Sequence, residues 1–297
     1  MRIIIAGGSG FLGRALHTRL RSDGHAVGIL TRQPRPGVHD DIAWTPDGAS
    51  GSWAQALDRV DAVVSLSGEG IADRRWSAAR KQALKASRLL PTRSLVAAFG
   101  QVSRPPAVFI SGSAVGYYGA RGDDIITEAE PPGSGFLATL CVEWEAEAAR
   151  ASTITRVVLL RTAPVLHPDG GALGKMLLPF RMGVGGPLGS GTQFMPWIHL
   201  ADWVDFIVWL VNTGGAQGAF NVTAPVPVTN ADFSRTLGKV LHRPAVVPVP
   251  AFGLRLLIGE LADSLLTGQR AVPARAEEAG FQFRFRELEP ALRDLLG

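Results

Sequence analysis

A glycine-rich turn near the start, GGSGFLG at residues 7–13, leaves this chain few ways to fold. Gly8, Gly10 and Gly13 fit the spacing G-x-G-x-x-G, and the turn lies between a β-rich run, 2–6, and a stretch with apolar helical periodicity. Glycines at this spacing allow a tight strand-to-helix turn whose backbone amides point outward, and the helix start adds partial positive charge. The turn therefore predicts a site for the diphosphate of a dinucleotide.

Strand-like and helix-like segments alternate through the first half of the chain. Further strands are expected at 26–31, 42–44, 62–66, 107–111 and 155–160, and further helices at 74–99 and 136–151. Continuous apolar runs such as 62–66 are typical of strands that are covered on both faces. This order predicts right-handed crossovers, and hence an α/β fold with a Rossmann-type, doubly wound parallel sheet.

The alternation ends after Arg161. Segment 170–191 is rich in glycine and proline, which predicts loops that reach over a ligand. A helix at 201–212 and a late strand at 219–222 are expected to return to the sheet. The expected dinucleotide-binding domain is 1–165 with 198–224, and the expected smaller, mostly helical region that covers the substrate is 166–197 with 225–297.

The composition excludes several other classes of protein. Of the 297 residues, 46% are hydrophobic and 19% are charged, so the chain is neither disordered nor collagenous. A single cysteine, Cys141, rules out an internal disulfide, and the six histidines lack the spacing of a metal site. The net charge is only +4 and the basic residues are scattered, so the sequence has no clustered basic patch of the kind that binds nucleic acid.

No apolar run approaches the length of a signal segment or of a membrane span. We therefore expect a cytoplasmic protein with a small-molecule substrate and with neither a nucleic-acid nor a membrane partner. The sequence leaves the oligomeric state open.

The end of the second expected strand indicates which dinucleotide is bound. A site selective for NAD has Asp or Glu there to accept a hydrogen bond from the 2′-hydroxyl of the adenosine ribose, but this chain has Thr31 followed by Arg32, with Arg35 nearby. A guanidinium at this point suits a 2′-phosphate and predicts NADP(H), although a solvated loop arginine is the alternative. The segment 66–68 ends the fourth strand, where a doubly wound sheet opens its ligand crevice.

Five ordered blocks span nearly the whole chain: GGSGFLG, VDAVVSLSGEGIADRRW, FISGSAVGYYG, GGPLGSGTQFMPWIHLADW and a C-terminal stretch that begins PVPAFGLRLLIGELADSLL. Together they resemble the atypical extended short-chain dehydrogenases/reductases, and more narrowly the epimerase family with a DUF1731-type C-terminal region. The resemblance implies a Rossmann domain that binds NADP(H), closed over the substrate by a small helical domain at about 248–297. The expected cofactor contacts are Gly7, Ser9, Gly10, Phe11, Leu12, Gly13, Arg32, Leu66, Ser67, Gly68 and Ser111.

The residues expected to carry the reaction are incomplete. Members of this superfamily use a serine and a Tyr-x-x-x-Lys pair, in which the tyrosine transfers a proton and the lysine lowers the pKa of its phenol. Ser113 matches the serine, but the positions that align with the tyrosine and lysine are Phe136 and Leu140. Two tyrosines lie nearby, and for each the alternative is an ordinary packed aromatic. We take Tyr117, with Ser113, as a candidate catalytic residue and Tyr118 as a candidate substrate contact.

Other polar residues are weaker candidates. Glu69 either faces the substrate or precedes a helix start. His199 could act as a base, or it could have a structural role together with Asp202, which could cap a turn. Glu143 could approach the crevice or lie in a solvated row, and Lys175 could contact a substrate anion.

Two functions of different kinds fit these residues. The first is an NADP(H)-dependent oxidoreductase or epimerase-like enzyme that acts on a small carbonyl or alcohol, with Ser113 polarising the reacting oxygen. The second is a sensor or regulatory protein that binds NADP(H) without chemistry, which the replacement of both proton-transfer residues by Phe136 and Leu140 favours.

Overall fold

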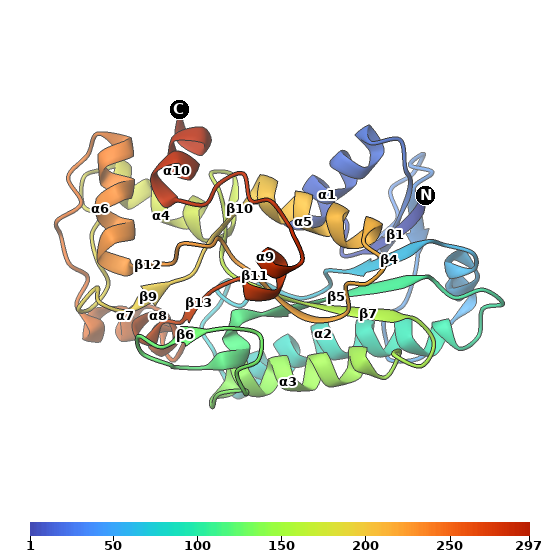
Figure 1. The fold of residues 1–297 in the computed structure, drawn as a ribbon. Helices are drawn as coiled ribbons and strands as arrows, with labels where there is room; N and C mark the ends of the chain where they lie inside the picture. The colour runs from blue at the N-terminus through green and yellow to red at the C-terminus, as the bar shows by residue number, and fades with distance from the viewer.

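The computed structural model describes residues 1–297, and a seven-stranded parallel sheet with the order β11-β7-β5-β4-β1-β2-β3 forms its centre (Figure 1). The strands are β1 (Arg2–Ala6), β2 (Ala26–Thr31), β3 (Asp41–Ala43), β4 (Ala62–Ser65), β5 (Val108–Ala114), β7 (Arg156–Thr162) and β11 (Gly218–Val222). Chain order reverses between β1 and β4, which is the point where such sheets open a ligand crevice at the carboxyl ends of their strands. The predicted doubly wound parallel sheet is confirmed.

Helices cover both faces of this sheet (Figure 1). One face carries α1 (Phe11–Ser22) and α5 (Leu200–Asn212), and the other carries α2 (Ala78–Phe99) and α3 (Phe136–Ala149). Alternate residues of β1 serve the two layers: Ile3 and Ile5 pack with Leu16 of α1, whereas Ile4 packs with Leu95 of α2. Burial on both faces explains why the central strands are continuous apolar runs.

A smaller, mostly helical region follows β7. Most of it lies at the end of the molecule remote from the N-terminus, but its short helix at 274–278 lies beside β11 at the centre (Figure 1). Its helices are α4 (Gly171–Arg181), α6 (Asn230–Leu241), α7 (Ala251–Ile258), α8 (Leu261–Thr267), α9 (Ala274–Glu278) and α10 (Leu288–Leu296). The pairs β8 (Val165–His167) with β10 (Ile198–His199), β9 (Phe194–Met195) with β12 (Val228–Thr229), and β6 (Ile125–Ile126) with β13 (Arg270–Ala271) complete the strands. Leu173, Phe233 and Leu292 join α4, α6 and α10 in one buried cluster.

The two parts of the chain are interleaved. The expected late strand is β11, which returns to the sheet and pairs with β7 in the register Gly218↔Val158. The C-terminal stretch also contributes Phe281 and Phe283 to the buried cluster between the sheet and α5. None of the helices is both long and apolar enough to cross a bilayer.

One expectation about secondary structure was wrong. Segment 170–191 was expected to consist of loops, but its first half is the helix α4. Leu173, Leu177 and Phe180 follow the spacing i, i+4, i+7, and their burial on one helix face outweighs the low helix propensity of the surrounding glycines.

Candidate functional site

The glycine turn lies at the carboxyl end of β1, directly beside the end of β4. Gly7 has a φ of +82°, and a Cβ there would lie 2.8 Å from the backbone of Leu66. A Cβ at Gly13 would lie 2.3 Å from the Gly7 carbonyl oxygen, so α1 can approach the turn only with glycine at this position. The exposed Gly10 caps α1 without a side-chain hydrogen bond, which leaves the first amides of the helix available to an anion.

The two arginines after β2 differ in their surroundings. Arg35 donates to both carboxylate oxygens of Asp41, at 2.9 and 2.8 Å, and this contact lowers the pKa of that carboxyl to about 2. Arg32 is exposed, and its side chain has no hydrogen-bond or ion-pair partner within the protein. The guanidinium of Arg32 is therefore the one that remains available to a phosphate on the adenosine ribose.

Helix α2 places a further basic residue beside the segment that follows β4. Arg88 of α2 lies against Gly68, where a Cβ would be 3.1 Å from the guanidinium carbon. Its guanidinium donates to the carbonyl oxygens of Leu84 and Glu69, at 3.1 and 2.9 Å, and burial lowers its pKa. No carboxylate forms an ion pair with this half-buried guanidinium, and withdrawing a cation from water without a counter-ion is costly. An anionic group bound beside Gly68 would supply the missing charge.

Sequence reasoning missed Arg88. Its position within α2 is visible in the sequence, but the face of the helix that meets Gly68 depends on how α2 packs on the sheet. Ser111, which was expected to contact the cofactor, is fully buried in β5, and its hydroxyl donates to the Gly112 carbonyl oxygen at 3.4 Å. The segment Leu66–Gly68 leads from the buried end of β4 to the surface.

A buried ion pair orients Ser113. The Ser113 hydroxyl donates to Glu145 of α3 at 2.6 Å, and the same carboxylate receives two hydrogen bonds of 2.9 Å from Arg161. Ser113 and Arg161 are direct partners in the register of β5 and β7. Sequence reasoning missed Glu145 and Arg161 as neighbours of the serine, because strand register and helix packing bring them together.

The two adjacent tyrosines have different environments. The partly buried ring of Tyr117 lies over Arg161, with the guanidinium carbon 3.5 Å from the ring centroid. Tyr118 is fully buried, donates to the Asn221 side-chain oxygen at 2.7 Å and accepts from Arg161 at 2.9 Å, and burial raises its pKa to about 12. The expected substrate contact at Tyr118 is therefore corrected, because neither its ring nor its hydroxyl is accessible. Tyr117 is the tyrosine that remains partly exposed.

Apolar packing occupies the positions that align with the tyrosine and lysine of the superfamily. Phe136 meets Trp76 edge-on, with ring centroids 5.1 Å apart, and the ammonium of Lys81 lies 5.3 Å from the Phe136 centroid. Leu140 is buried in a cluster with Trp144. The neighbouring thiol, Cys141, is also buried, and burial raises its pKa to about 11. No group at these two positions can transfer a proton.

Glu69 and His199, two of the weaker candidates, both form contacts within the protein. Glu69 is exposed at the crevice and forms an ion pair with Arg80. His199 is buried, with its Nδ1 accepting from the Ala201 amide at 3.0 Å and its Nε2 lying 3.2 Å from a carboxylate oxygen of Asp294. These contacts join α5 to α10 and give His199 a structural role.

Three other side chains also have partners. Asp202 accepts from the backbone amides of residues 284 and 285 at 2.8 and 2.9 Å. Glu143 pairs with Lys85 on α2. The ammonium of Lys175 lies 3.1 Å from Asp73, an exposed residue in the loop after β4.

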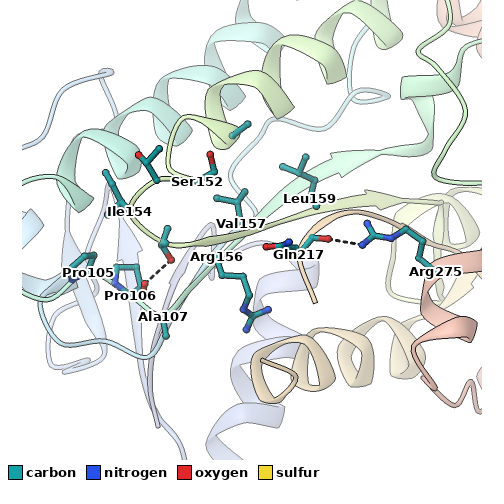
Figure 2. Close-up of a pocket in the computed structure, with 14 residues that line it drawn as sticks. Pro105, Pro106, Ala107, Ser152, Ile154, Arg156, Val157, Leu159, Gln217 and Arg275 are labelled. Carbon is teal, nitrogen blue, oxygen red and sulfur yellow. Dashed lines mark hydrogen bonds between the residues drawn. The ribbon is translucent and has the colours of Figure 1, made fainter. Parts of the chain in front are cut away.

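A separate cavity of about 830 Å³ lies at the opposite, amino-terminal ends of β5, β7 and β11 (Figure 2). Arg156 and Arg275 flank it, but their guanidinium groups donate to backbone carbonyl oxygens, including that of Gln217 at 2.8 Å from Arg275. Side chains of Val157 and Leu159 line the space between them. This cavity is remote from the glycine turn, and none of the candidate residues lines it.

Comparison with known proteins gives a family for most of the chain. The model of the NAD dependent epimerase/dehydratase family matches residues 3–223, and that of the domain of unknown function DUF1731 matches residues 249–295. The epimerase family protein Mb2239 of Mycobacterium bovis is 43% identical over 98% of this chain and 96% of its own length.

Two solved structures extend the comparison. The crystal structure of human epimerase family protein SDR39U1 (isoform 2) with NADPH has a TM-score of 0.92 and 37% identity, and the match covers 99% of each chain. The nucleoside-diphosphate sugar epimerase from Corynebacterium glutamicum has a TM-score of 0.81 and 33% identity, over 100% of this chain and 58% of its own.

Proposed function

The chain belongs to the NAD dependent epimerase/dehydratase family, and from this premise we propose that it is an NADP(H)-dependent oxidoreductase or epimerase-like enzyme. Its substrate would be a small carbonyl or alcohol bound at the carboxyl ends of β4 and β5. The observation that carries the proposal is the pair of unpaired guanidinium groups, Arg32 and Arg88, placed on either side of the glycine turn.

The residues at the turn fit NADP(H). The first amides of α1, after Gly10, would bind the diphosphate, and Arg32 would bind the 2′-phosphate of the adenosine ribose. Arg88 would place its charge next to the cofactor beside Gly68. The NADPH in the crystal structure of the human relative supports this assignment. When bound, the nicotinamide donates or accepts a hydride.

Ser113 and Tyr117 are the proposed groups that handle the substrate oxygen. Glu145 accepts the only proton of the Ser113 hydroxyl and fixes it at the end of β5, so Ser113 would accept a hydrogen bond from a substrate hydroxyl rather than donate one. The Tyr117 phenol is the available proton donor, because Phe136 occupies the usual position and Tyr118 is buried. The guanidinium of Arg161 against the Tyr117 ring would stabilise negative charge that develops when the proton leaves.

The apolar packing of Phe136 and Leu140 also supports a second candidate, an NADP(H) sensor without catalysis. The sensor would retain the glycine turn and both arginines, and would respond to the cofactor by a change in binding to another molecule. Only the enzyme requires Tyr117 and Ser113 to act on a substrate.

A panel of small carbonyl compounds and alcohols, followed through NADPH absorbance, separates the two candidates. For the enzyme we expect turnover that falls about 100-fold or more in Tyr117→Phe and Ser113→Ala, with NADPH affinity unchanged. Tyr118→Phe makes the same chemical change on a buried ring and removes one hydrogen bond to Arg161, so its turnover should fall far less than that of Tyr117→Phe. Tight NADPH binding without turnover across the panel would instead favour the sensor, and absence of NADPH binding would exclude both.

A further inference from the structure

Helix α7 turns most of its apolar side chains to solvent. Phe252, Leu256 and Leu257 are 74%, 75% and 71% exposed, and Leu254 is the only fully buried residue of the helix. Large apolar side chains exposed singly are ordinary, but three on one short helix form a patch. A helix that presents this face to water is expected to be covered by another surface.

Two neighbouring segments extend the patch. The end of α4 and the residues after it expose Leu178, Met182 and Val184, and the segment before α7 exposes Val246 and Val247. Backbone contacts hold these segments together: the amide of residue 247 donates to the carbonyl oxygen of residue 185 at 3.3 Å. We call the exposed apolar residues of 178–184, 246–247 and 252–257 the apolar end surface. It lies at the end of the molecule opposite the N-terminus (Figure 1).

The unpaired charges around the apolar end surface are basic. Segments 170–201 and 233–259, which carry it, contain no aspartate or glutamate. Arg181 and Arg243 are exposed and form no ion pair, and the Arg243 guanidinium holds the two segments together by donating to the residue 181 carbonyl oxygen at 3.1 Å. Arg75 lies beside the end of α7, where a Cβ at Gly259 would be 3.4 Å from its Nε. The nearest acids, such as Asp263, are already paired with basic residues.

We propose that the apolar end surface docks on a lipid bilayer that carries anionic headgroups. The leucine and phenylalanine side chains of α7 would enter the boundary between headgroups and acyl chains, and Arg181 and Arg243 would lie among the lipid phosphates. A second copy of this chain fits less well, because the same surface on the partner offers no unpaired acid to the unpaired arginines. This proposal departs from the sequence-based expectation of no membrane partner, which rested on hydropathy along the chain. Hydropathy does not reveal such a surface, because its residues come from separate short segments.

Co-sedimentation of the full chain with lipid vesicles tests this proposal. We expect binding to vesicles of phosphatidylcholine mixed with phosphatidylglycerol, and much weaker binding to phosphatidylcholine alone or at high salt. The double variant Phe252→Ser, Leu256→Ser should lose at least about tenfold in affinity for the mixed vesicles. Arg181→Glu with Arg243→Glu should lose the preference for anionic vesicles. Val142→Ser, an exposed apolar position on α3, is the matched control and should bind as the wild type does.

Three results would overturn the proposal. These are no binding to either kind of vesicle, equal binding to neutral and anionic vesicles, or a dimer in analytical ultracentrifugation that Phe252→Ser, Leu256→Ser converts to a monomer. The last result would show that a second copy covers the surface. The substituted apolar side chains are exposed, so circular dichroism should give their variants the thermal midpoint of the wild type, which separates lost binding from lost folding. The arginine variant also loses the Arg243 hydrogen bond to the residue 181 carbonyl oxygen, so its binding is measured below its own midpoint.

Discussion

Arg32 and Arg35 lie three residues apart after β2, yet only one of them has a free guanidinium. Arg35 is bound by Asp41, whereas Arg32 has no partner within the protein. We therefore expect Arg32→Ala to weaken NADPH binding by about 10- to 100-fold and to leave NADH binding nearly unchanged, because only NADPH carries the 2′-phosphate. Calorimetric titration with both cofactors measures the two affinities.

The matched control for that titration is Arg35→Ala. This variant removes a guanidinium three residues away whose hydrogen bonds already go to Asp41, so the ratio of NADPH to NADH affinity should stay close to that of the wild type. An equal loss of affinity for both cofactors in Arg32→Ala would remove Arg32 from the 2′-phosphate site.

The contact between Arg35 and Asp41 also predicts a dependence of stability on pH. Its hydrogen bonds lower the pKa of Asp41 to about 2 in the folded protein, from 3.8. Folding then gains stability from the ionised carboxylate above about pH 4, and this gain disappears as the pH falls toward 2. The difference in the free energy of unfolding between wild type and Arg35→Ala should therefore shrink over this range.

Urea denaturation at a series of pH values measures that difference. Arg32→Ala is the control, because Arg32 has no carboxylate partner and its effect on stability should not change between pH 4 and pH 2. A difference for Arg35→Ala that stays constant down to pH 2 would contradict the prediction.

Residues whose role is steric and local can be predicted from the sequence, and residues whose role depends on a distant partner cannot. The demand for glycine at Gly13 comes from the Gly7 carbonyl oxygen within the same turn, so the spacing alone revealed it. Arg88 gains its importance from lying against Gly68, twenty residues away. Arg88 was missed, whereas Tyr118 was wrongly selected. Its position in the sequence is close to the serine, but the sequence could not show that its side chain is buried in the core.

At the level of secondary-structure elements, one ion pair ties α3 to the two strands that carry the site. Glu145 on α3 binds Arg161 on β7 and Ser113 on β5, and both charged side chains are buried. Replacing Glu145 with glutamine leaves the charge of Arg161 buried without a counter-ion. We expect Glu145→Gln to lower the free energy of unfolding by about 3–5 kcal/mol.

Glu147 gives the matched control, because it lies two residues further along α3 and pairs with the more exposed Arg93. Glu147→Gln should cost about 1 kcal/mol or less, since such pairs are screened by water. Urea denaturation of both variants measures the two costs. Equal losses in the two variants would mean that the buried pair contributes no more than a surface pair.

Element boundaries followed local signals where these were strong. Strands β1 and β2 and the ends of α2 and α3 lie within a few residues of their expected positions, because apolar runs and periodicity are carried by the elements themselves. Helix α4 was missed because its glycines suggested loops, and the burial of Leu173, Leu177 and Phe180 against α6 and α10 depends on elements far along the chain. The small strand pairs were missed for the same reason.

At the scale of the whole molecule, the C-terminal stretch is part of the main core. Phe281 packs against Phe206 of α5, with ring centroids 4.9 Å apart, and lies in the same cluster as Ile3 and Val64 of the sheet. Strand β13 pairs with β6, and Arg275 of α9 donates to the residue 217 carbonyl oxygen at 2.8 Å, next to β11. The sequence separates a nucleotide domain from a covering region, but their side chains share buried clusters.

This shared core predicts that the protein unfolds as one unit. Scanning calorimetry should show a single transition, and saturation with NADPH at about 100 times its Kd should stabilise the whole molecule by about 2.7 kcal/mol.

Phe281→Ala, in the C-terminal stretch, should lower the midpoint of that same transition, because it removes about 3–5 kcal/mol of packing from the core under the sheet. Leu265→Ala, at an exposed position of α8, should leave the midpoint nearly unchanged. Two separate transitions, with Phe281→Ala or NADPH moving only one of them, would instead mean that the covering region folds independently of the sheet.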